Sequence, residues 1–301
     1  MEPTIPESIR AGAQSWTLEE GLVTGIAADP LSLLAHGAAM FADAPIRALE
    51  LEDPDAEWQP DAVIPRLAAS PWFAKIESLS AGLYRDVAEG DILATLVAAM
   101  PNLVTLRVPH PATILACAQL PLPVLAGVYI YCEGSNDGDA ALAALAKRPR
   151  LLRELQIVGC AITDEAARTI ALARWPLTRL AFGGTHYAAD RLGARGAMAL
   201  ANNSSLAALA TLDLVATAID DDAVRVLAAS AHLGALRELG LAENPSVTDA
   251  GLAALAASPI AATLAKLAVH ATAVTADGIA AFTARHPHVD IANHNFTTWG
   301  G

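Results

Sequence analysis

The sequence predicts a single right-handed α/β solenoid with a parallel β-sheet on its concave side and helices on its convex side. Two observations predict this fold. An apolar triple of the form L-x-x-L-x-L returns ten times, and its middle residues are spaced by 22 to 32 positions, just under 27 on average. Between successive triples, a turn leads into a segment with apolar residues at helical spacing. A strand–turn–helix unit that buries its apolar face only against its neighbours is the unit of a solenoid.

Composition agrees with a packed chain and excludes several classes of partner. Of the 301 residues, 54% are hydrophobic and 17% are charged, so a core is expected. Alanine supplies 68 residues, which favours closely packed helices. The formal net charge of −13 argues against nucleic acid and anionic membranes, because both are bound through clustered cations. The sequence shows no leader-like start and no apolar run of about 18 residues, so we expect a cytoplasmic protein. We also expect it to be a monomer.

The chain contains three cysteines, Cys117, Cys132 and Cys160. Their number is odd, and none of them forms a C-x-x-C pair. This pattern predicts reduced, buried thiols and no disulfide framework or zinc site.

The middle residue of each triple marks a predicted strand. These residues are Leu49, Leu79, Leu106, Val128, Leu155, Leu180, Leu212, Leu239, Leu267 and Val289. In the clearest unit, Thr248 or Asp249 is the expected helix N-cap, and Leu252 with Leu255 forms an apolar helix face. The same order recurs at Thr163, at Asp220 and at Thr275. Strand, turn, helix and return is therefore the predicted unit.

The two ends of the solenoid need covers, because an unpaired end strand and an open core would aggregate. We expect an N-terminal cap over residues 1–45, about nine repeats over residues 46–285 and a C-terminal cap strand and tail over residues 286–301. Asp29 followed by Pro30 predicts a helix start in the first cap. In the tail, Phe296 and Trp299 either plug the last open face or belong to a disordered segment.

Two repeats depart from the regular spacing. Prolines 109, 111, 121 and 123 leave room for only about two helical turns, from Thr113 to Gln119. After Phe182, a longer turn carries His186 and Tyr187 on one rim. Such rim loops often carry function in repeat proteins, and neutral drift in a surface loop is the alternative.

The repeats resemble the leucine-rich-repeat family, and in particular its ribonuclease-inhibitor-like class. Leu155-x-Ile157-x-x-Cys160 and Leu239-x-Leu241-x-x-Asn244 match the family's L-x-L-x-x-N/C element. The resemblance covers about residues 46–291 and implies that the Asn or Cys is buried beneath the sheet, where it bonds neighbouring turns. Near that place, other units carry a different residue: Glu133, Thr185 and Thr217. The N-terminal layout is similar to bacterial proteins of the repeat-companion type, without the companion domain.

Residues that alternate with the buried ones in each strand are expected on the concave face. The candidate protein-binding residues there are Arg107, Tyr129, Tyr131, Glu154, Gln156, Arg179, Asp213, Glu238 and Lys266, joined by His186 and Tyr187 on the rim. Tyr129 and Tyr131 are typical of binding hot spots, or they simply cover the short neighbouring unit. Arg107, Arg179 and Lys266 interrupt an otherwise acidic strip on this face. This charge pattern fits a partner with mixed but mostly basic charge, and a set of ordinary solvated surface residues would look the same.

Three acidic runs raise the question of a cation site. They lie at residues 53–57, 137–139 and 220–222, and we interpret them as helix caps and solubilising charge. His286, His288 and Asp290 alternate near the end, as in a metal site or a solvated strand. We predict no metal and no cofactor.

The sequence lacks the phosphate-loop, dinucleotide, nucleophile-elbow and H-E-x-x-H motifs. We therefore predict a protein that is not an enzyme. The expected function is a protein–protein interaction scaffold or inhibitor-like module that binds a protein partner through the concave sheet and the adjacent rim loops. Two alternatives stay open: a regulator of the GTPase-activating type, which the family resemblance implies, and a purely structural solenoid.

Overall fold

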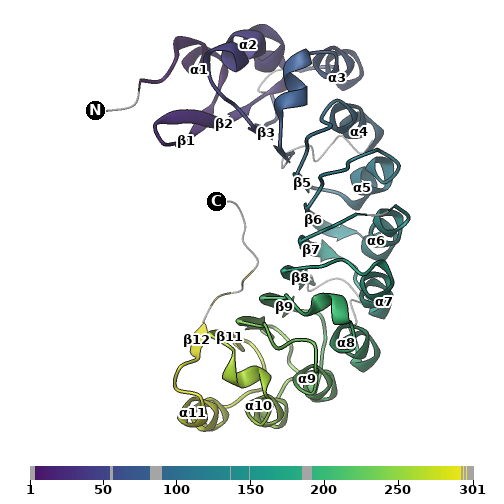
Figure 1. Ribbon diagram of the computed structural model, residues 1–301, viewed down its shortest axis with the longest axis vertical. Helices are drawn as coiled ribbons and strands as arrows, with labels where there is room; N and C mark the ends of the chain where they lie inside the picture. The colour runs from purple at the N-terminus through teal and green to yellow at the C-terminus, as the bar shows by residue number, and fades with distance from the viewer. Residues whose placement is uncertain are drawn as a thin grey trace. The chain divides into compact units, whose positions relative to one another are not determined.

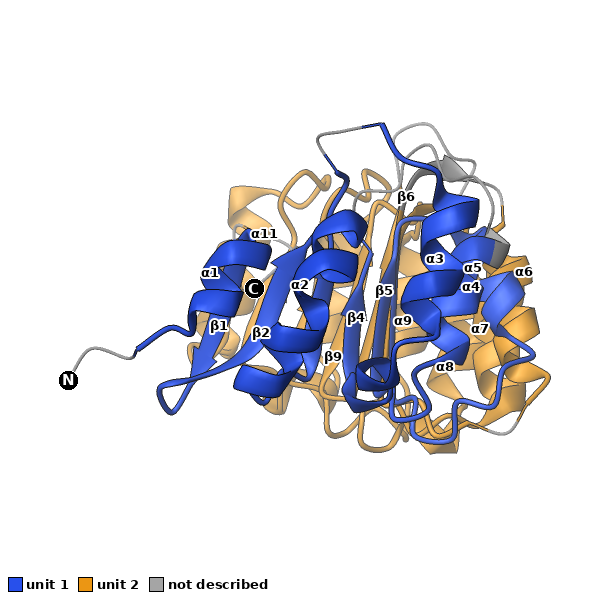
Figure 2. Cartoon of the chain, turned by 90° about the horizontal axis from the view of Figure 1, so that it is seen from above, with its two compact units in different colours: residues 1–130 blue, residues 131–301 orange. Residues whose placement is uncertain are grey.

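The computed structural model describes residues 4–54, 57–81, 90–135, 137–148, 150–184, 192–292, 294 and 296. The chain divides into two compact units, which we call unit 1 (residues 1–130) and unit 2 (residues 131–301) (Figure 2). In both units strands and helices alternate along the chain, and the helices lie on one side of the sheet (Figure 1).

The strands of unit 1 begin with a hairpin, in which β1 (Ser15–Glu19) pairs antiparallel with β2 (Leu22–Ala28). Strands β3 (Ala48–Leu51), β4 (Ser78–Ser80), β5 (Thr105–Val108) and the start of β6 (Gly127–Ser135) then follow in parallel. Its helices are α1 (Glu7–Gly12), α2 (Pro30–Asp43), α3 (Pro60–Ala68), α4 (Gly90–Ala98) and α5 (Pro111–Cys117), with a 3-10 turn η1 (Pro71–Lys75). Leu49, Leu79, Leu106 and Val128 stand in register across the strands, as the triples predict.

Unit 2 repeats the same plan. Its strands are β7 (Glu154–Cys160), β8 (Arg179–Gly183), β9 (Thr211–Val215), β10 (Glu238–Gly240), β11 (Lys266–Ala268) and β12 (Asp290–Ala292). They pair in parallel and in chain order. Its helices are α6 (Gly138–Ala146), α7 (Asp164–Ala173), α8 (Ala194–Ala201), α9 (Asp221–Ala228), α10 (Asp249–Ala256) and α11 (Ala276–Arg285), with 3-10 turns η2 (Ser204–Leu206) and η3 (Ile260–Ala262).

Within each unit the predicted register holds as far as β11, and it is wrong in the last strand. Leu267 pairs with Ile291, not with Val289. Val289 and Ile291 are two residues apart, so both lie on the same face of an extended chain, and Val289 is also buried. A period-two pattern cannot distinguish these two registers, which explains the error.

Helix starts follow the sequence closely. The Asp29 carboxylate accepts the N–H groups of Leu31 and Ser32 at 2.9 and 3.0 Å, which confirms the predicted cap of α2. Thr163, Asp220, Thr248 and Thr275 likewise cap α7, α9, α10 and α11. The helix expected between the prolines is short as predicted, although Pro111 starts it two residues early.

Cysteine chemistry departs from the expectation. Cys160, at the end of β7, is disulfide-bonded, so the prediction that all thiols are reduced is wrong. Cys117 is buried and reduced. Odd numbers of cysteines leave pairing open, and sequence spacing does not show which strands bring two sulfur atoms together.

The boundaries expected for the two caps stay predictions.

Within the described ranges, helices are either too short or too polar to cross a membrane.

Candidate protein-interaction surface

The sheet has one face covered by helices and one opposite face, which we call the open face. Strand alternation places the leucines under the helices and the candidate binding residues on the open face. Within each unit the parallel strands pair in register, so equivalent positions of successive repeats form rows across the strands.

In unit 1, the open face carries an arginine–tyrosine pair. Arg107 and Tyr129 are register partners on β5 and β6, and the Arg107 guanidinium carbon lies 4.8 Å from the centre of the Tyr129 ring. Tyr129 is only 6% exposed. The expectation that this tyrosine is an exposed anchor is therefore wrong: its ring lies beneath a cation that itself stays half-buried. Tyr131, the first residue of unit 2, is half-buried.

Unit 1 also carries two glutamates near the end of β3. Burial, and then the negative charge of Glu50, raise the pKa of Glu52 above its usual value. These two like charges make the local surface acidic, which agrees with the predicted acidic strip.

In unit 2, the first row of the open face is charged and ordered. We define the first row as Glu154, Arg179, Thr211, Glu238 and Lys266. Its four charged members are half-buried. The Thr211 hydroxyl donates to Glu238 Oε2 at 3.0 Å, and Lys266 Nζ lies 3.3 Å from Glu238 Oε1. These contacts hold the Glu238 carboxylate in one place between two neighbouring strands.

The second row of the open face is buried throughout. We define it as Gln156, Ala181, Asp213, Gly240, Ala268 and Ala292. Gln156 and Asp213 are both 0% exposed, so neither is available to a partner in this state, contrary to the sequence-based expectation. For Asp213 the reason is a segment of the same chain.

Phe296 lies on the open face of unit 2. Its ring, 6% exposed, packs against Val215, Ala242, Ala268 and Ala292. Its backbone N–H donates to Asp213 Oδ2 at 2.8 Å, and its carbonyl oxygen accepts from Arg179 Nη1 at 3.2 Å.

Glycine at position 240 makes room for this arrangement. A Cβ atom on Gly240 would overlap the Asp213 carboxylate, which therefore lies directly over β10. Sequence alternation places Asp213 on the open face, but a contact between residues 83 positions apart leaves no periodic signal. In the sequence, the local sign that another segment packs on this face is the run of small residues at positions 240, 242, 268 and 292.

Two candidate rim residues, His186 and Tyr187, lie outside the described residues, as does Trp299.

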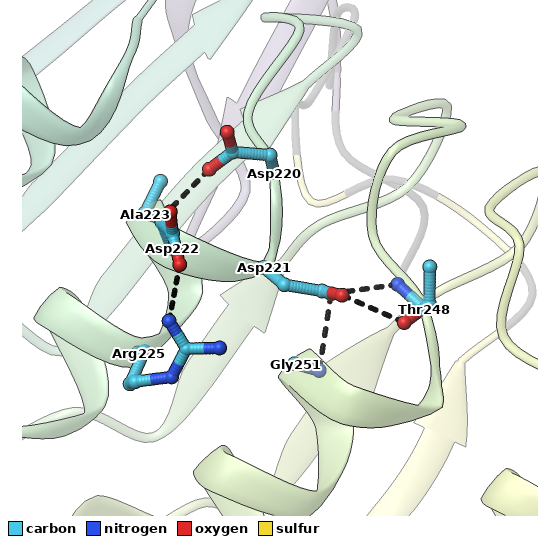
Figure 3. Close-up of polar contacts among 7 residues, drawn as sticks. All are labelled: Asp220, Asp221, Asp222, Ala223, Arg225, Thr248 and Gly251. Atoms are coloured by element: carbon cyan, nitrogen blue, oxygen red, sulfur yellow. Dashed lines mark hydrogen bonds and ion pairs between the residues drawn. The ribbon is translucent and has the colours of Figure 1, made fainter.

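The acidic run at residues 220–222 does more than cap its own helix (Figure 3). Asp220 caps its own helix by accepting the N–H of Ala223. Asp221 instead bonds the next helix: it accepts the N–H and hydroxyl of Thr248 at 2.8 and 2.7 Å and the N–H of Gly251 at 3.0 Å.

The same contact recurs between other helices of unit 2, and we call it the Asp ladder. Asp139 accepts the N–H and hydroxyl of Thr163, and Asp249 does the same with Thr275. Asp164 accepts from the N–H groups of Gly193 and Gly196 at 2.9 and 2.8 Å. Sequence reasoning missed the ladder. Its signal is an Asp in the first helical turn followed one repeat later by a cap residue and, in three of the four cases, a glycine three positions after that residue.

The histidines near the C-terminus also have structural partners. His286 Nε2 lies 2.8 Å from the Ala256 carbonyl oxygen, and His288 Nε2 lies 3.3 Å from that of Ala261. Among the described residues, no group of three His, Cys, Asp or Glu side chains is arranged to hold a metal ion.

Acid should weaken the Asp ladder. Partial burial raises the pKa of Asp221, but the hydrogen bonds from Thr248 and Gly251, with the charge of Arg225, outweigh it, so the net pKa is below its usual value. A carboxylate with a lowered folded-state pKa adds stability above its unfolded pKa and loses it as the pH falls through the folded pKa.

We therefore expect Asp221→Asn to lower the free energy of unfolding at pH 7, with a penalty that shrinks as the pH falls to about 3. Urea titrations across this range measure it. Asp222→Asn is the control, because Asp222 is exposed and pairs with Arg225 one turn away in the same helix. A penalty that stays constant with pH would show that the Asp221 charge does not matter.

Comparisons with known proteins agree with the geometry. Residues 149–171, which include β7, match the family model described as Leucine Rich repeat. The structure of Rad7 from a Rad7–Elc1 complex in yeast has a TM-score of 0.65 at 17% identity, over 90% of this chain and 69% of that chain.

Two other solved structures are more distant. An internalin from Listeria monocytogenes has a TM-score of 0.42 at 14% identity, over 83% of this chain and 73% of that chain. TLR13 in complex with ssRNA13 has a TM-score of 0.42 at 12% identity, over 82% of this chain and 35% of that chain. No curated protein matches the sequence. The in-register repeats, the family match over one of them and the fold shared with Rad7 together show that this chain has the leucine-rich-repeat fold.

Proposed function

We propose that the chain is a non-catalytic scaffold, or inhibitor-like module, that binds a protein partner through the open face of its sheet. The observation that carries the proposal is the ordered first row, in which Glu238 is held between Thr211 and Lys266. Side chains already fixed in place lose little conformational entropy when a partner docks, so more of the contact energy appears as affinity. The neighbour Rad7 was solved in a complex with Elc1, which supports a protein partner.

Charge indicates the kind of partner. The net charge of −13, and the acidic pair Glu50 and Glu52, favour a partner surface that is mainly basic. The same charge disfavours nucleic acid and anionic membranes. The proposal includes the ribonuclease-inhibitor-like class, because helices of up to ten residues follow the strands of unit 2. It also includes a monomeric state.

The geometry gives the GTPase-activating alternative no support. Such a regulator would need an arginine or another side chain able to reach a nucleotide. Two arginines of the open face are candidates for this role: Arg107, which lies over Tyr129, and Arg179, which bonds the Phe296 carbonyl. Both have structural partners within their own unit.

The location is a separate question. A cytoplasmic protein is the sequence-based prediction, but a disulfide at Cys160 is typical of an oxidising compartment. Alkylation of thiols in intact cells, followed by mass spectrometry, decides between the two. A reduced Cys160 supports the cytoplasm, and an oxidised Cys160 contradicts it.

Matched charge reversals test the interaction surface. The open-face variant combines Arg107→Glu and Lys266→Glu. The control combines Arg168→Glu and Arg225→Glu, which make the same charge change on α7 and α9. We expect the open-face variant to weaken binding of a captured native partner by about tenfold or more, while the control keeps wild-type affinity.

Circular dichroism and urea unfolding of both variants show whether they remain folded. Equal binding by wild type and both folded variants would contradict the proposal and support a purely structural solenoid. Equal loss in both variants would place the interaction elsewhere and would also contradict it.

A further inference from the structure

Phe296, near the C-terminus, occupies part of the open face of unit 2. Phe296 is 117 residues from Arg179 and 83 from Asp213, yet it bonds both. Phe296 follows the last strand in the chain, yet it lies beside residues of β8 and β9. Phe296 thus covers part of the open face that we propose for binding.

Both polar contacts to Phe296 are made to its backbone. The buried Asp213 carboxylate accepts the N–H, and Arg179 donates to the carbonyl oxygen. Backbone groups are the same in every residue but proline, so these two contacts can hold an extended segment of almost any sequence. Charge-assisted hydrogen bonds of this kind are stronger than neutral ones.

The side-chain contact provides the selectivity. Val215, Ala242, Ala268 and Ala292 form an apolar floor with one residue from each of the last four repeats, and the Phe296 ring lies on it. Three of these side chains are single methyl groups, which leave room above the sheet for a flat ring. An aromatic side chain buries a large apolar area on such a floor, whereas a small or charged one does not.

We propose that Arg179, Asp213 and this floor form a recognition site for an extended protein segment with an aromatic residue, and that Phe296 occupies it in cis. A partner segment of the same chemistry binds when it displaces Phe296. Because a tethered segment has an effective concentration in the millimolar range, the resident Phe296 lowers the apparent affinity for the partner. This inference rests on the proposed function and adds the partner's chemistry and an autoinhibitory contact.

The test uses full-length protein and a fluorescent peptide with the sequence of residues 293–299, Asn-His-Asn-Phe-Thr-Thr-Trp. Phe296→Ala in the protein vacates the floor while leaving the sheet intact. Fluorescence anisotropy should show that this variant binds the peptide about tenfold or more tightly than wild type does. Leu172→Ala, which shortens an exposed side chain on α7, is the control and should bind as wild type does.

Changes on the peptide side keep the test independent of protein folding. A peptide with Phe replaced by Ala should lose binding to the Phe296→Ala protein, and one with Phe replaced by Tyr should keep most of it. In the protein, adding Arg179→Ala, at a half-buried position, should weaken binding several-fold. Equal peptide binding by wild type and Phe296→Ala, or indifference to the peptide's phenylalanine, would overturn the inference.

The two proposals fail differently. If the peptide does not bind but the open-face charge reversals still lose the native partner, this inference is wrong and the scaffold proposal stands. If the peptide binds as expected but the charge reversals have no effect, the aromatic site stands and the wider interaction surface does not.

Discussion

Asn244→Ala is expected to lower the free energy of unfolding by about 3 kcal/mol. Asn244 is 0% exposed and forms hydrogen bonds to two repeats. Its Nδ2 group donates to the carbonyl oxygens of Leu214, Leu241 and Ala242 at 2.8, 3.0 and 3.0 Å, and its Oδ1 atom accepts the N–H of Ile219 at 3.2 Å. Alanine removes every one of these bonds and leaves buried backbone groups without them, which costs more than the bonds themselves contribute.

Urea denaturation followed by circular dichroism measures the effect. Asn202→Ala is the matched control, because Asn202 is exposed at the end of α8, and we expect its change to be below about 0.5 kcal/mol. Equal stabilities for the two variants would mean that Asn244 does not hold the neighbouring turns together.

Gly251→Ala is expected to lower the free energy of unfolding by about 2 kcal/mol, although helix propensity alone predicts a gain of about 1 kcal/mol. Gly251 lies in the first turn of α10, where its N–H donates to Asp221. A Cβ atom there would come within 2.5 Å of Asp221 Oδ1, closer than real side chains approach. The Asp221 carboxylate would have to move, and its bonds to Thr248 would weaken with it.

A double-mutant cycle separates this clash from other causes. Once Asp221→Ala has removed the carboxylate, Gly251→Ala should cost much less, so the two penalties should not add. Gly234→Ala is the control, because nothing lies within 4 Å of a Cβ atom there. Additive penalties, or equal effects of Gly251→Ala and Gly234→Ala, would contradict the role of the Asp ladder.

The repeat pattern predicts most of the fold because each repeat contacts mainly its neighbours, so local periodicity determines the strand positions. The leucines from Leu49 to Leu267 confirm this, and so do the caps at Thr248 and Asp220. Asn244 is buried and bonded as the family resemblance implies. The register error at Val289 lies where only a two-residue shift separates the alternatives.

The candidate surface was harder to predict. Alternation shows which face a side chain takes, and it correctly puts Asp213 and Gln156 on the open face, but it does not show what covers that face. Phe296 reaches Asp213 through a long-range contact that has no periodicity. The Asp ladder was missed for a related reason: a first-turn Asp satisfies the capping pattern within its own helix, and only the spacing between helices shows that it bonds the next one.

Hydrogen exchange at the Phe296 backbone amide tests most directly whether the open face of unit 2 receives an extended segment. This amide donates to a buried carboxylate in the folded chain. We expect its exchange to be slower by about tenfold or more in the wild-type protein than in a folded Asp213→Ala variant. Exchange at the rate of an unstructured amide in the wild-type protein would contradict the occupied open face.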